Sequence, residues 1–340
     1  MEFDEYKQMS DAEKYGYFSS EEGLFHVVTA RQFTREILES LASEADRLRS
    51  AACEPEGIRE LNTLLSRKRA MLFFSQPSTR TFLSFMNACH ILGVHVSEVR
   101  DLSLTSSTKG ESFDDTIRTF ASYTDVIIMR HPEDDSAERA ACVLDGHEKR
   151  IPLINAGSGK KEHPTQALLD VYTLMREFAD SGGIDGKTIL MAGDLKRGRT
   201  VRSLCCMLSE FTDVDILFAA VPEYQMKDDI RSFLAEKGIA CRDINDFGDA
   251  LGQADAVYMT RVQDEHDVDG ESHSVDFSRF HLKKEHLDIM KKGAVIMHPL
   301  PRREEIPPEI DADTRAAYWR QEENGLWIRA ALIANVLKGQ

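Results

Sequence analysis

Short apolar runs recur along the chain, and the segments between them carry apolar residues at helical spacing. Eight runs rich in Ile, Val, Leu, Met and Ala are predicted to be strands: residues 70–74, 95–99, 125–129, 152–155, 188–192, 215–219, 256–259 and 294–297. In the segment after the first run, Phe82, Phe85, Met86 and Cys89 fall at i, i+3, i+4 and i+7, which indicates a helix with one buried face. This alternation predicts an α/β fold in which helices flank parallel sheets.

Length and turn residues predict two domains. A chain of 340 residues is too long for one ordinary hydrophobic core. The turn-rich sequence ADSGGIDGK at residues 179–187 separates the first four predicted strands from the last four. We therefore expect the division between two α/β domains around residues 165–182. Residues 1–24 are polar, and we expect them to be loosely held.

Composition is that of a soluble globular protein and argues against several classes of partner. Hydrophobic residues make up 42% of the chain, and no run reaches the roughly 18 apolar residues that a membrane helix needs. The formal net charge of −16 argues against nucleic acid and anionic membranes, because affinity for phosphate polymers comes chiefly from Lys and Arg. The acidic N-terminal sequence MEFDEYKQ is typical of neither a signal peptide nor a transit peptide, so we expect a cytoplasmic protein.

The sequence gives no indication of a metal or a cofactor. Its six cysteines lack CxxC spacing, and the adjacent Cys205 and Cys206 lie on a helical pattern where they are expected to pack as small apolar residues. The sequence GDLKRG at residues 193–198 lacks the third glycine of a dinucleotide-binding fingerprint. The sequence GKT at residues 186–188 precedes a predicted strand, whereas a phosphate-binding P-loop follows one.

Cationic and hydroxyl-bearing motifs follow most of the predicted strands. They are STRT at 78–81, TKGE at 108–111, MRHP at 129–132, HPTQ at 163–166, GRT at 198–200, RVQ at 261–263 and HPLP at 298–301. Ligands of open α/β sheets bind beyond the carboxyl ends of the strands, and guanidinium groups there suit a small anionic substrate. A helix that starts after Ser78 also offers its free N–H groups to phosphate. None of the motifs brings a nucleophile and a base together.

The motifs divide by the charge that each is suited to bind. Arg130, His163, Gln166 and Thr81 are expected to converge on a carbonyl oxygen, as in an oxyanion hole. Arg199 and Arg261 suggest two carboxylates held by forked contacts. Each of these residues alone also fits a plainer role as a helix cap or a surface ion pair. Together they predict that cationic groups distant in sequence gather around a phosphate, a carbonyl and a dicarboxylate.

In this order the motifs resemble those of the aspartate/ornithine carbamoyltransferase family, from about residue 25 to the C-terminal sequences NGL at 324–326 and RAAL at 329–332. The resemblance implies a carbamoyl phosphate-binding domain at residues 1–165, completed by a C-terminal helix at 325–340, and an aspartate-binding domain at residues 166–324. It also implies a homotrimer with shared active sites. Whether separate regulatory chains join it stays open.

The resemblance further implies a role for individual residues. The carbamoyl phosphate binders are Ser78, Thr79, Arg80, Thr81, Arg130, His163, Gln166, Leu300 and Pro301. The aspartate binders are Lys109, Arg199, Arg261 and Gln263. The catalytic residues among these are Arg80, Thr81, Lys109, Arg130 and His163. In the family the segment that carries Lys109 reaches the site of a neighbouring subunit, and the Leu300–Pro301 bond is cis.

The implied activity is transfer of the carbamoyl group of carbamoyl phosphate to the amino group of L-aspartate, which gives N-carbamoyl-L-aspartate and phosphate for pyrimidine biosynthesis. Aspartate is favoured because Pro299 stands where ornithine members carry a cysteine, and because Arg261 would repel a cationic acceptor. Ser75–Gln76, Phe82 and Met86 depart from the family pattern around the first loop. Two alternatives therefore stay open: another amine acceptor, such as ornithine or a derivative, and a catalytically weakened homologue.

Overall fold

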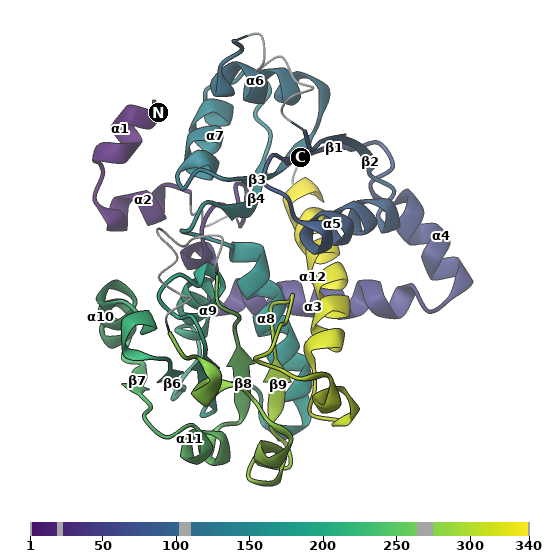
Figure 1. The fold of residues 1–340 in the computed structure, drawn as a ribbon. Coiled ribbons are helices and arrows are strands. Elements are labelled where there is room, and N and C mark those ends of the chain that lie inside the picture. Colours follow the sequence, from purple (N-terminus) through teal and green to yellow (C-terminus); the bar gives the residue numbers. More distant parts are fainter. Residues whose placement is uncertain (1, 19–22, 102–109, 264–274, 339–340) are drawn as a thin grey trace. The chain divides into compact units, whose positions relative to one another are not determined.

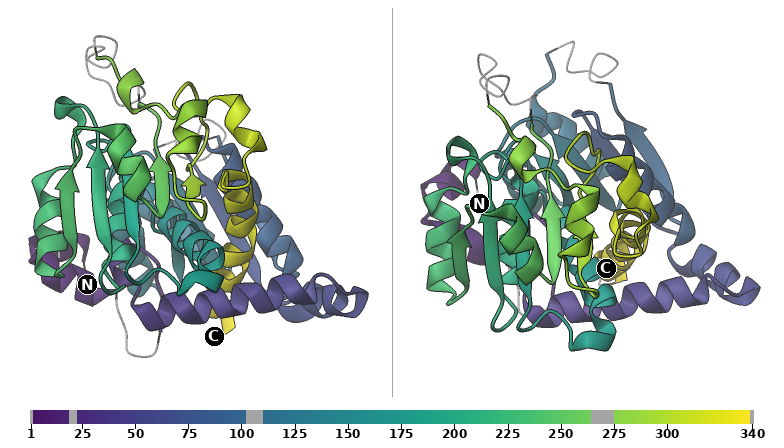
Figure 2. Two further views of the ribbon diagram at one scale, coloured as in Figure 1. Left: turned by 90° about the horizontal axis from the view of Figure 1, so that it is seen from below. Right: turned by 60° about the horizontal axis from the view of Figure 1, so that its bottom comes forward.

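A computed structural model describes residues 2–18, 23–101, 110–263 and 275–338. The chain divides into two compact units: unit 1 comprises Met1–Leu169 and Asn324–Gln340, and unit 2 comprises Asp170–Glu323. Each unit contains one parallel sheet flanked by helices (Figures 1 and 2), so the predicted α/β fold class is confirmed. No helix in the described ranges combines the length and the apolar character that crossing a membrane requires.

Unit 1 is built on a four-stranded sheet of order β2-β1-β3-β4. Its strands are β1 (Arg69–Phe74), β2 (His95–Val99), β3 (Val126–His131) and β4 (Leu153–Ser158). The helices α3 (Arg35–Ala51), α4 (Pro55–Leu64), α5 (Thr79–Ile91), α6 (Phe113–Tyr123) and α7 (Ser136–Asp145) belong to the same unit. The central strands are almost fully buried, whereas the edge strand β2 is largely exposed. This matches the apolar runs, since a central strand of a covered parallel sheet has no solvent face.

Unit 2 contains a five-stranded sheet of order β7-β6-β5-β8-β9. Its strands are β5 (Thr188–Ala192), β6 (Asp215–Ala219), β7 (Ala240–Asp243), β8 (Ala256–Met259) and β9 (Val295–Met297). Its helices are α9 (Arg199–Leu208), α10 (Asp228–Glu236) and α11 (Phe247–Gln253). The strand β7 was not predicted, because its sequence ACRD is short, polar and exposed at the edge of the sheet.

Two helices continue from one unit into the other: α8 (Pro164–Glu177) and α12 (Tyr318–Lys338). The unit 1 part of α12 packs against helices of that unit. Arg49 Nη1 donates to Asn324 Oδ1 at 2.8 Å, and the Arg329 guanidinium lies 5.1 Å from the centre of the Phe85 ring. These contacts join the last part of the chain to α3 and α5.

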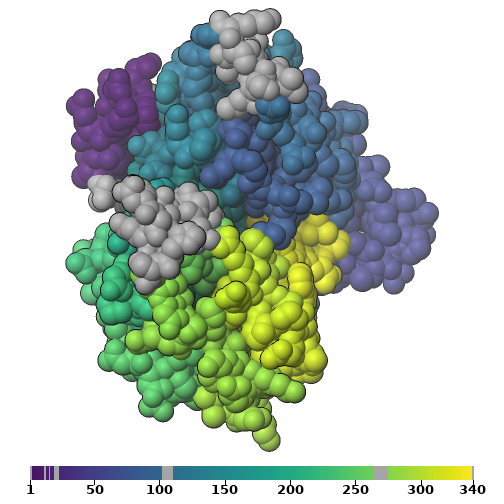
Figure 3. Space-filling view, viewed as in Figure 1, coloured from purple at the N-terminus to yellow at the C-terminus, as the bar shows by residue number. Residues whose placement is uncertain are grey.

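The N-terminal segment is more ordered than predicted. It forms α1 (Phe3–Gln8) and α2 (Asp11–Tyr17), which lie beside α7 (Figures 1 and 3). Tyr6 and Phe18 are buried in the same apolar cluster as the helices of unit 1. Tyr17 also donates a hydrogen bond of 3.1 Å to Asp145 Oδ2. The expectation of a loosely held segment is therefore wrong for residues 3–18, because a few aromatic side chains anchor an otherwise polar sequence.

Candidate active site

Each sheet has one topological switch point, where successive strands of the chain are added on opposite sides. The predicted site residues lie in or after the strands that flank these switch points. In unit 1 the sheet grows from β1 to β2 in one direction and to β3 in the other, and in unit 2 it grows from β5 to β6 and to β8. The carboxyl edge at such a switch point is where open α/β sheets bind ligands. Arg80 follows β1 and Arg130 lies in β3, while Arg199 follows β5 and Arg261 follows β8.

The start of α5 presents donors at the end of β1. Ser78 occupies the N-cap position, but its side chain makes no capping hydrogen bond. Thr79 and Arg80 are exposed, and Thr81 is buried at 6% exposure. The first N–H groups of a helix have no partner within it, and its positive dipole end attracts anions. This end of α5 is therefore suited to a phosphate group.

Arg130 and His163 are in direct contact at the end of β3 and the start of α8. Arg130 Nη1 lies 3.3 Å from His163 Nε2 and donates to the carbonyl oxygen of Ala156 at 3.2 Å. Arginine has no acceptor, so in this contact Nε2 accepts and the proton of the imidazole is on Nδ1. Gln166 follows one helical turn later, where its N–H bonds to the His163 carbonyl at 3.0 Å. The structure thus brings the side chains of Arg130 and His163 together and places Gln166 one turn further along, within α8.

The loop after β1 is joined to the end of β3. Ser75 Oγ and the Gln76 N–H both bond to the Arg130 carbonyl at 3.3 Å. The sheet register also pairs Phe74 with Arg130. Ser75 and Gln76, two of the residues that depart from the family pattern, therefore hold the loop between β1 and α5 against Arg130.

Phe82 occupies an aromatic site with a cation over it. Its ring is buried at 3% exposure and meets the Phe74 ring edge to face, with centroids 5.3 Å apart. The Arg100 guanidinium, which follows β2, lies 4.3 Å from the centre of the Phe82 ring. A cation over an aromatic face is attracted by the ring quadrupole. Arg100 therefore brings a guanidinium to the first turn of α5, which sequence reasoning did not foresee.

In unit 2, a buried carboxylate joins the loops that carry the predicted aspartate binders. Asp194, fully buried after β5, accepts from Arg197 Nε at 2.8 Å and from the Gln263 N–H at 3.2 Å. Arg199 begins α9 and is buried at 8% exposure. Arg261 Nη1 donates to the Val262 carbonyl at 2.9 Å. Asp194 was missed in the sequence because its role depends on the adjacency of β5 and β8.

A close backbone approach fixes the same two loops. Gly193 has a φ of 115°, and a Cβ placed there would lie 2.1 Å from the Thr260 carbonyl oxygen. Thr260 in turn donates from its N–H to the Ala192 carbonyl at 2.7 Å. Only glycine fits this position. The sequence GDLKRG thus forms a tight connection from β5 to α9.

The HPLP segment follows β9, the neighbour of β8. Its Leu300–Pro301 peptide bond is cis, and Leu300 has a φ of 44°. The Leu300 N–H donates to His298 Nδ1 at 2.8 Å, and His298 Nε2 lies 2.8 Å from Glu305 Oε1. Burial alone would raise the pKa of Glu305, but the hydrogen bond and charge of His298 together with backbone N–H donors outweigh it and lower the pKa. Neither His298 nor Glu305 was predicted as a functional residue.

Two remaining predictions concern Lys109 and metals. Lys109 lies outside the described residues. Across the part of the chain that the structure describes, no group of three or more His, Cys, Asp or Glu side chains is arranged to hold a metal ion.

Comparison with known families decides what the two units are. Residues 26–176 match the model of the aspartate/ornithine carbamoyltransferase carbamoyl-P binding domain, and residues 185–336 match that of the Asp/Orn binding domain. The chain belongs to the aspartate/ornithine carbamoyltransferase family. The first match falls mainly on unit 1 and the second mainly on unit 2.

Individual relatives of the carbamoyltransferase family are similar over nearly the whole chain. The chloroplastic aspartate carbamoyltransferase of Arabidopsis thaliana is 41% identical over 93% of this chain and 78% of its own length. The aspartate transcarbamoylase of Trypanosoma cruzi in complex with N-(phosphonacetyl)-L-aspartic acid is 34% identical, with a TM-score of 0.83 over 92% of this chain and 96% of that chain. The catalytic subunit of the M. Jannaschii enzyme is 35% identical, with a TM-score of 0.83 over 93% of this chain and 99% of that chain.

These comparisons correct the predicted cytoplasmic location. The relatives from Arabidopsis thaliana and Oryza sativa carry the word chloroplastic in their names, which contradicts the prediction. The prediction was drawn from the composition of eight N-terminal residues. Compartment is decided by targeting signals and not by the carbamoyltransferase fold, so that composition was a poor guide.

Proposed function

We propose that the protein transfers the carbamoyl group of carbamoyl phosphate to the α-amino group of L-aspartate. The observation that carries the proposal is the placement of the donors at the two switch points. The donors of unit 1 suit a phosphate and a carbonyl oxygen, and those of unit 2 suit carboxylates. Relatives that cover more than nine-tenths of this chain are named aspartate carbamoyltransferase, which supports the same reaction.

In this proposal unit 1 holds the phosphate and the carbonyl oxygen of carbamoyl phosphate. The phosphate lies at the start of α5, where Ser78, Thr79, Arg80 and Thr81 donate to its oxygens. The carbonyl oxygen lies near Arg130 and His163, whose 3.3 Å contact holds both side chains in one place. When the carbonyl carbon becomes tetrahedral, its oxygen gains negative charge. Donors fixed beforehand around this oxygen stabilise the transition state more than the ground state.

Unit 2 holds L-aspartate. Arg199 and Arg261 bind its two carboxylates, and Gln263 adds an amide donor. Asp194 keeps the two loops in register through its bonds to Arg197 and Gln263. A guanidinium beside the acceptor attracts the carboxylates of aspartate. It would repel ornithine, which carries an additional positively charged amino group. A structure of the similar aspartate transcarbamoylase from Trypanosoma cruzi is a complex with carbamoyl phosphate and aspartate together, which supports this choice.

Transfer begins when the uncharged amine of aspartate attacks the carbonyl carbon. A carbon–nitrogen bond forms, the bond from carbon to the phosphate oxygen breaks, and phosphate leaves with the electron pair. The departing phosphate accepts the amine proton, so the reaction needs no separate base from the protein. Holding the two reactants in line supplies up to about 7–11 kcal/mol of the barrier in favourable cases.

Two further parts of the proposal concern residues and chains beyond those described. Lys109 contacts both substrates, as the family resemblance implies. The active form is a homotrimer in which the segment around Lys109 serves a neighbouring subunit. Its test is the molecular mass in solution, measured together with the recovery of activity when an inactive Lys109→Ala chain is mixed with an inactive Arg130→Gln chain. Mixed trimers are expected to regain part of the activity, and no recovery would contradict shared sites.

The reaction itself is tested by measuring products. The protein is incubated with carbamoyl phosphate and, in separate assays, with aspartate, ornithine or putrescine. We expect N-carbamoyl-L-aspartate and an equal amount of phosphate with aspartate, and no carbamoylated product with the other two. Product from ornithine but not from aspartate would contradict the choice of acceptor. Phosphate release without any carbamoylated amine would contradict transfer.

A further inference from the structure

A continuous chain of buried polar side chains runs through unit 2 to the HPLP segment. Its members come from α8, β8, α12 and the loop after β9, and each is at most 6% exposed: Asp170, Tyr258, Gln321, His298 and Glu305. Buried polar groups cost free energy unless they are hydrogen-bonded. The proposed reaction uses none of the five as a substrate ligand, so the presence of this hydrogen-bonded network needs another explanation.

His298 is held in one tautomer by its two neighbours. The Leu300 N–H donates to Nδ1 at 2.8 Å, so Nδ1 carries no proton. Nε2 therefore carries the proton and donates to Glu305 Oε1 at 2.8 Å. The Arg303 N–H donates to the same carboxylate oxygen at 2.8 Å. The imidazole thus connects the backbone of Leu300 to a fixed carboxylate within the same loop.

The backbone of His298 is held from the other side. Its N–H donates to Gln321 Oε1 at 3.0 Å, and Gln321 Nε2 donates to Asp170 Oδ1 at 2.6 Å. Tyr258 donates from its hydroxyl to Asp170 Oδ2 at 2.7 Å. Burial, together with the nearby charge of Asp170, raises the pKa of Tyr258, so the phenol keeps the proton that it donates. Each hydrogen bond of this network therefore pairs one donor with one acceptor.

We propose that His298 is a positioning residue that sets the orientation of the Leu300 backbone toward the carbamoyl amide. Glu305 fixes its imidazole, and Gln321 fixes its main chain. The inference rests on the proposed function and on the family resemblance, which implies that the backbone carbonyls of Leu300 and Pro301 accept hydrogen bonds from the carbamoyl NH2 group. His298 touches no substrate. It acts by holding an acceptor where the NH2 hydrogens point.

The test compares two ligands that differ in this NH2 group. Acetyl phosphate carries a methyl group where carbamoyl phosphate carries NH2, so only carbamoyl phosphate can donate to the Leu300 and Pro301 carbonyls. Dissociation constants of both ligands are measured without aspartate, for the wild type and for three variants. H298F removes both bonds of the imidazole. H298N restores an acceptor for the Leu300 N–H, as in an Asx turn, but does not reach Glu305. E305Q removes the charge of the carboxylate.

We expect the wild type to bind carbamoyl phosphate more tightly than acetyl phosphate. H298F should reduce this preference by about 3- to 10-fold, which is what a lost or misplaced hydrogen bond costs. H298N should recover part of the preference, and E305Q should lie between H298N and the wild type. A role in stability alone would weaken both ligands by the same factor in every variant. That result, or an unchanged preference in H298F, would overturn the proposal.

His286 provides a matched control in the same unit. Its Nδ1 accepts the Lys283 N–H at 3.1 Å, the same type of contact as that between His298 and Leu300, at the start of the short helix Lys284–Asp288. H286F should leave the preference unchanged. If H298F does not fold, E305Q tests the proposal instead: a reduced preference for carbamoyl phosphate over acetyl phosphate supports it, and an unchanged preference overturns it. A wild type that binds neither ligand would contradict the proposed function itself, which is a separate outcome from a wild type whose preference survives H298F.

Discussion

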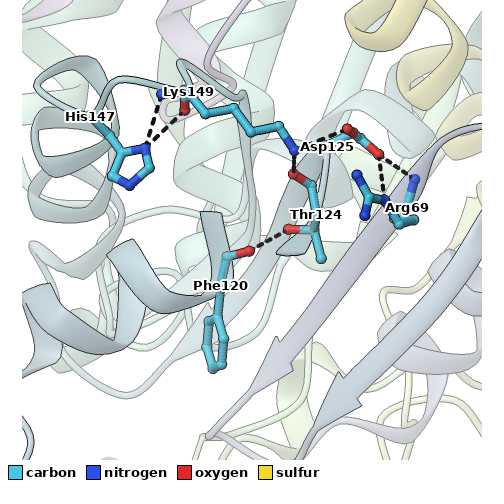
Figure 4. Close-up of polar contacts among 6 residues, drawn as sticks. All are labelled: Arg69, Phe120, Thr124, Asp125, His147 and Lys149. Carbon is cyan, nitrogen blue, oxygen red and sulfur yellow. Dashed lines mark hydrogen bonds and ion pairs between the residues drawn. The ribbon is translucent and has the colours of Figure 1, made fainter. Parts of the chain in front are cut away.

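The two ends of the unit 1 sheet use the same residue types in different ways. At the amino ends of β1 and β3, Asp125 accepts from Arg69 Nε at 3.2 Å and from Lys149 Nζ at 3.1 Å (Figure 4). At the carboxyl ends, Arg130 contacts a backbone carbonyl and the neutral imidazole of His163. The cations at the amino ends neutralise a carboxylate of the protein. Arg130 at the carboxyl end of β3 contacts a carbonyl dipole and an imidazole, and the proposed function places an anionic substrate at this edge of the sheet.

The comparison shows why the motifs after the strands were informative. An arginine in the sequence does not reveal whether a carboxylate of the protein will meet it. Position relative to the strand supplies part of this information, because the carboxyl edge at a switch point is where ligands bind. It does not supply all of it, since Arg197 after β5 bonds to the protein carboxylate of Asp194.

Arg130→Gln gives the largest effect. Removing a donor to the developing oxyanion should lower kcat by about 100- to 1,000-fold, or about 2.7–4 kcal/mol. The free energy of unfolding should change by less than about 1 kcal/mol. The control, Arg69→Gln, should leave kcat unchanged and lower the free energy of unfolding by about 1 kcal/mol. Steady-state kinetics and urea titrations measure both quantities. If Arg69→Gln lowered kcat as much as Arg130→Gln does, the amino and carboxyl ends of the unit 1 sheet would not differ in their role in catalysis.

Arg199→Gln and Arg261→Gln extend the comparison to unit 2. Each should raise the KM for aspartate by about 10- to 100-fold, since a hydrogen bond to a charged group contributes about 1.5–3 kcal/mol. The dissociation constant for carbamoyl phosphate should stay unchanged. Arg242→Gln on the edge strand β7, where Arg242 bonds to Gln253 Oε1 at 2.9 Å, is the matched control and should change neither. A rise in both constants would show that these arginines do not select the acceptor.

Asp125→Asn tests the amino end through stability. Partial burial alone would raise the pKa of Asp125, but hydrogen bonds from Arg69 and Lys149 outweigh it and lower the pKa below 3.8. A lowered pKa in the folded state stabilises the protein above the unfolded pKa of about 3.9, and this contribution is lost as the pH falls through the folded value. The variant should therefore lose about 1–2 kcal/mol of unfolding free energy at pH 7 and less near pH 3. A loss that is the same at both pH values would contradict this electrostatic role.

Arg100→Gln gives the smallest effect. A solvent-exposed cation over an aromatic ring contributes about 0.5–1 kcal/mol, so the free energy of unfolding should fall by no more than that. The dissociation constant for carbamoyl phosphate should rise by about 2-fold at low salt and less at high salt, because the guanidinium lies near the start of α5. Arg118→Gln on the exposed face of α6 should not change this constant. If the dissociation constant for carbamoyl phosphate depended on salt in the same way in both variants, Arg100 would have no role in phosphate binding.

The sequence predicted those parts of the molecule that depend on local pattern. Buried strands such as β1 and β5 are apolar along their whole length, and the motifs after them mark the carboxyl edges of the sheets. The edge strand β7 was missed because an exposed strand needs no apolar run. The helices α1 and α2 were missed because their stability comes from the packing of Tyr6 and Phe18 on distant elements.

The candidate site was likewise predicted only where the local sequence pattern was informative. Arg130, His163 and Gln166 stand out because cations and amides after strands are conspicuous in the sequence. Asp194 and His298 do not, because their importance comes from which loops they join. That information resides in strand order and register, which a single sequence does not contain. The roles of the substrate-binding residues therefore stay predictions until the variants are measured.

The central claim is that the donors at the two switch points act on one pair of substrates. N-(phosphonacetyl)-L-aspartate joins a phosphonate to an aspartate and tests it directly by calorimetric titration. We predict that the wild type binds this compound far more tightly than phosphonoacetate, and that Arg80→Gln weakens both ligands. Arg261→Gln should weaken only N-(phosphonacetyl)-L-aspartate. Binding of N-(phosphonacetyl)-L-aspartate that is unaffected by Arg261→Gln, or no tighter than that of phosphonoacetate, would contradict the account.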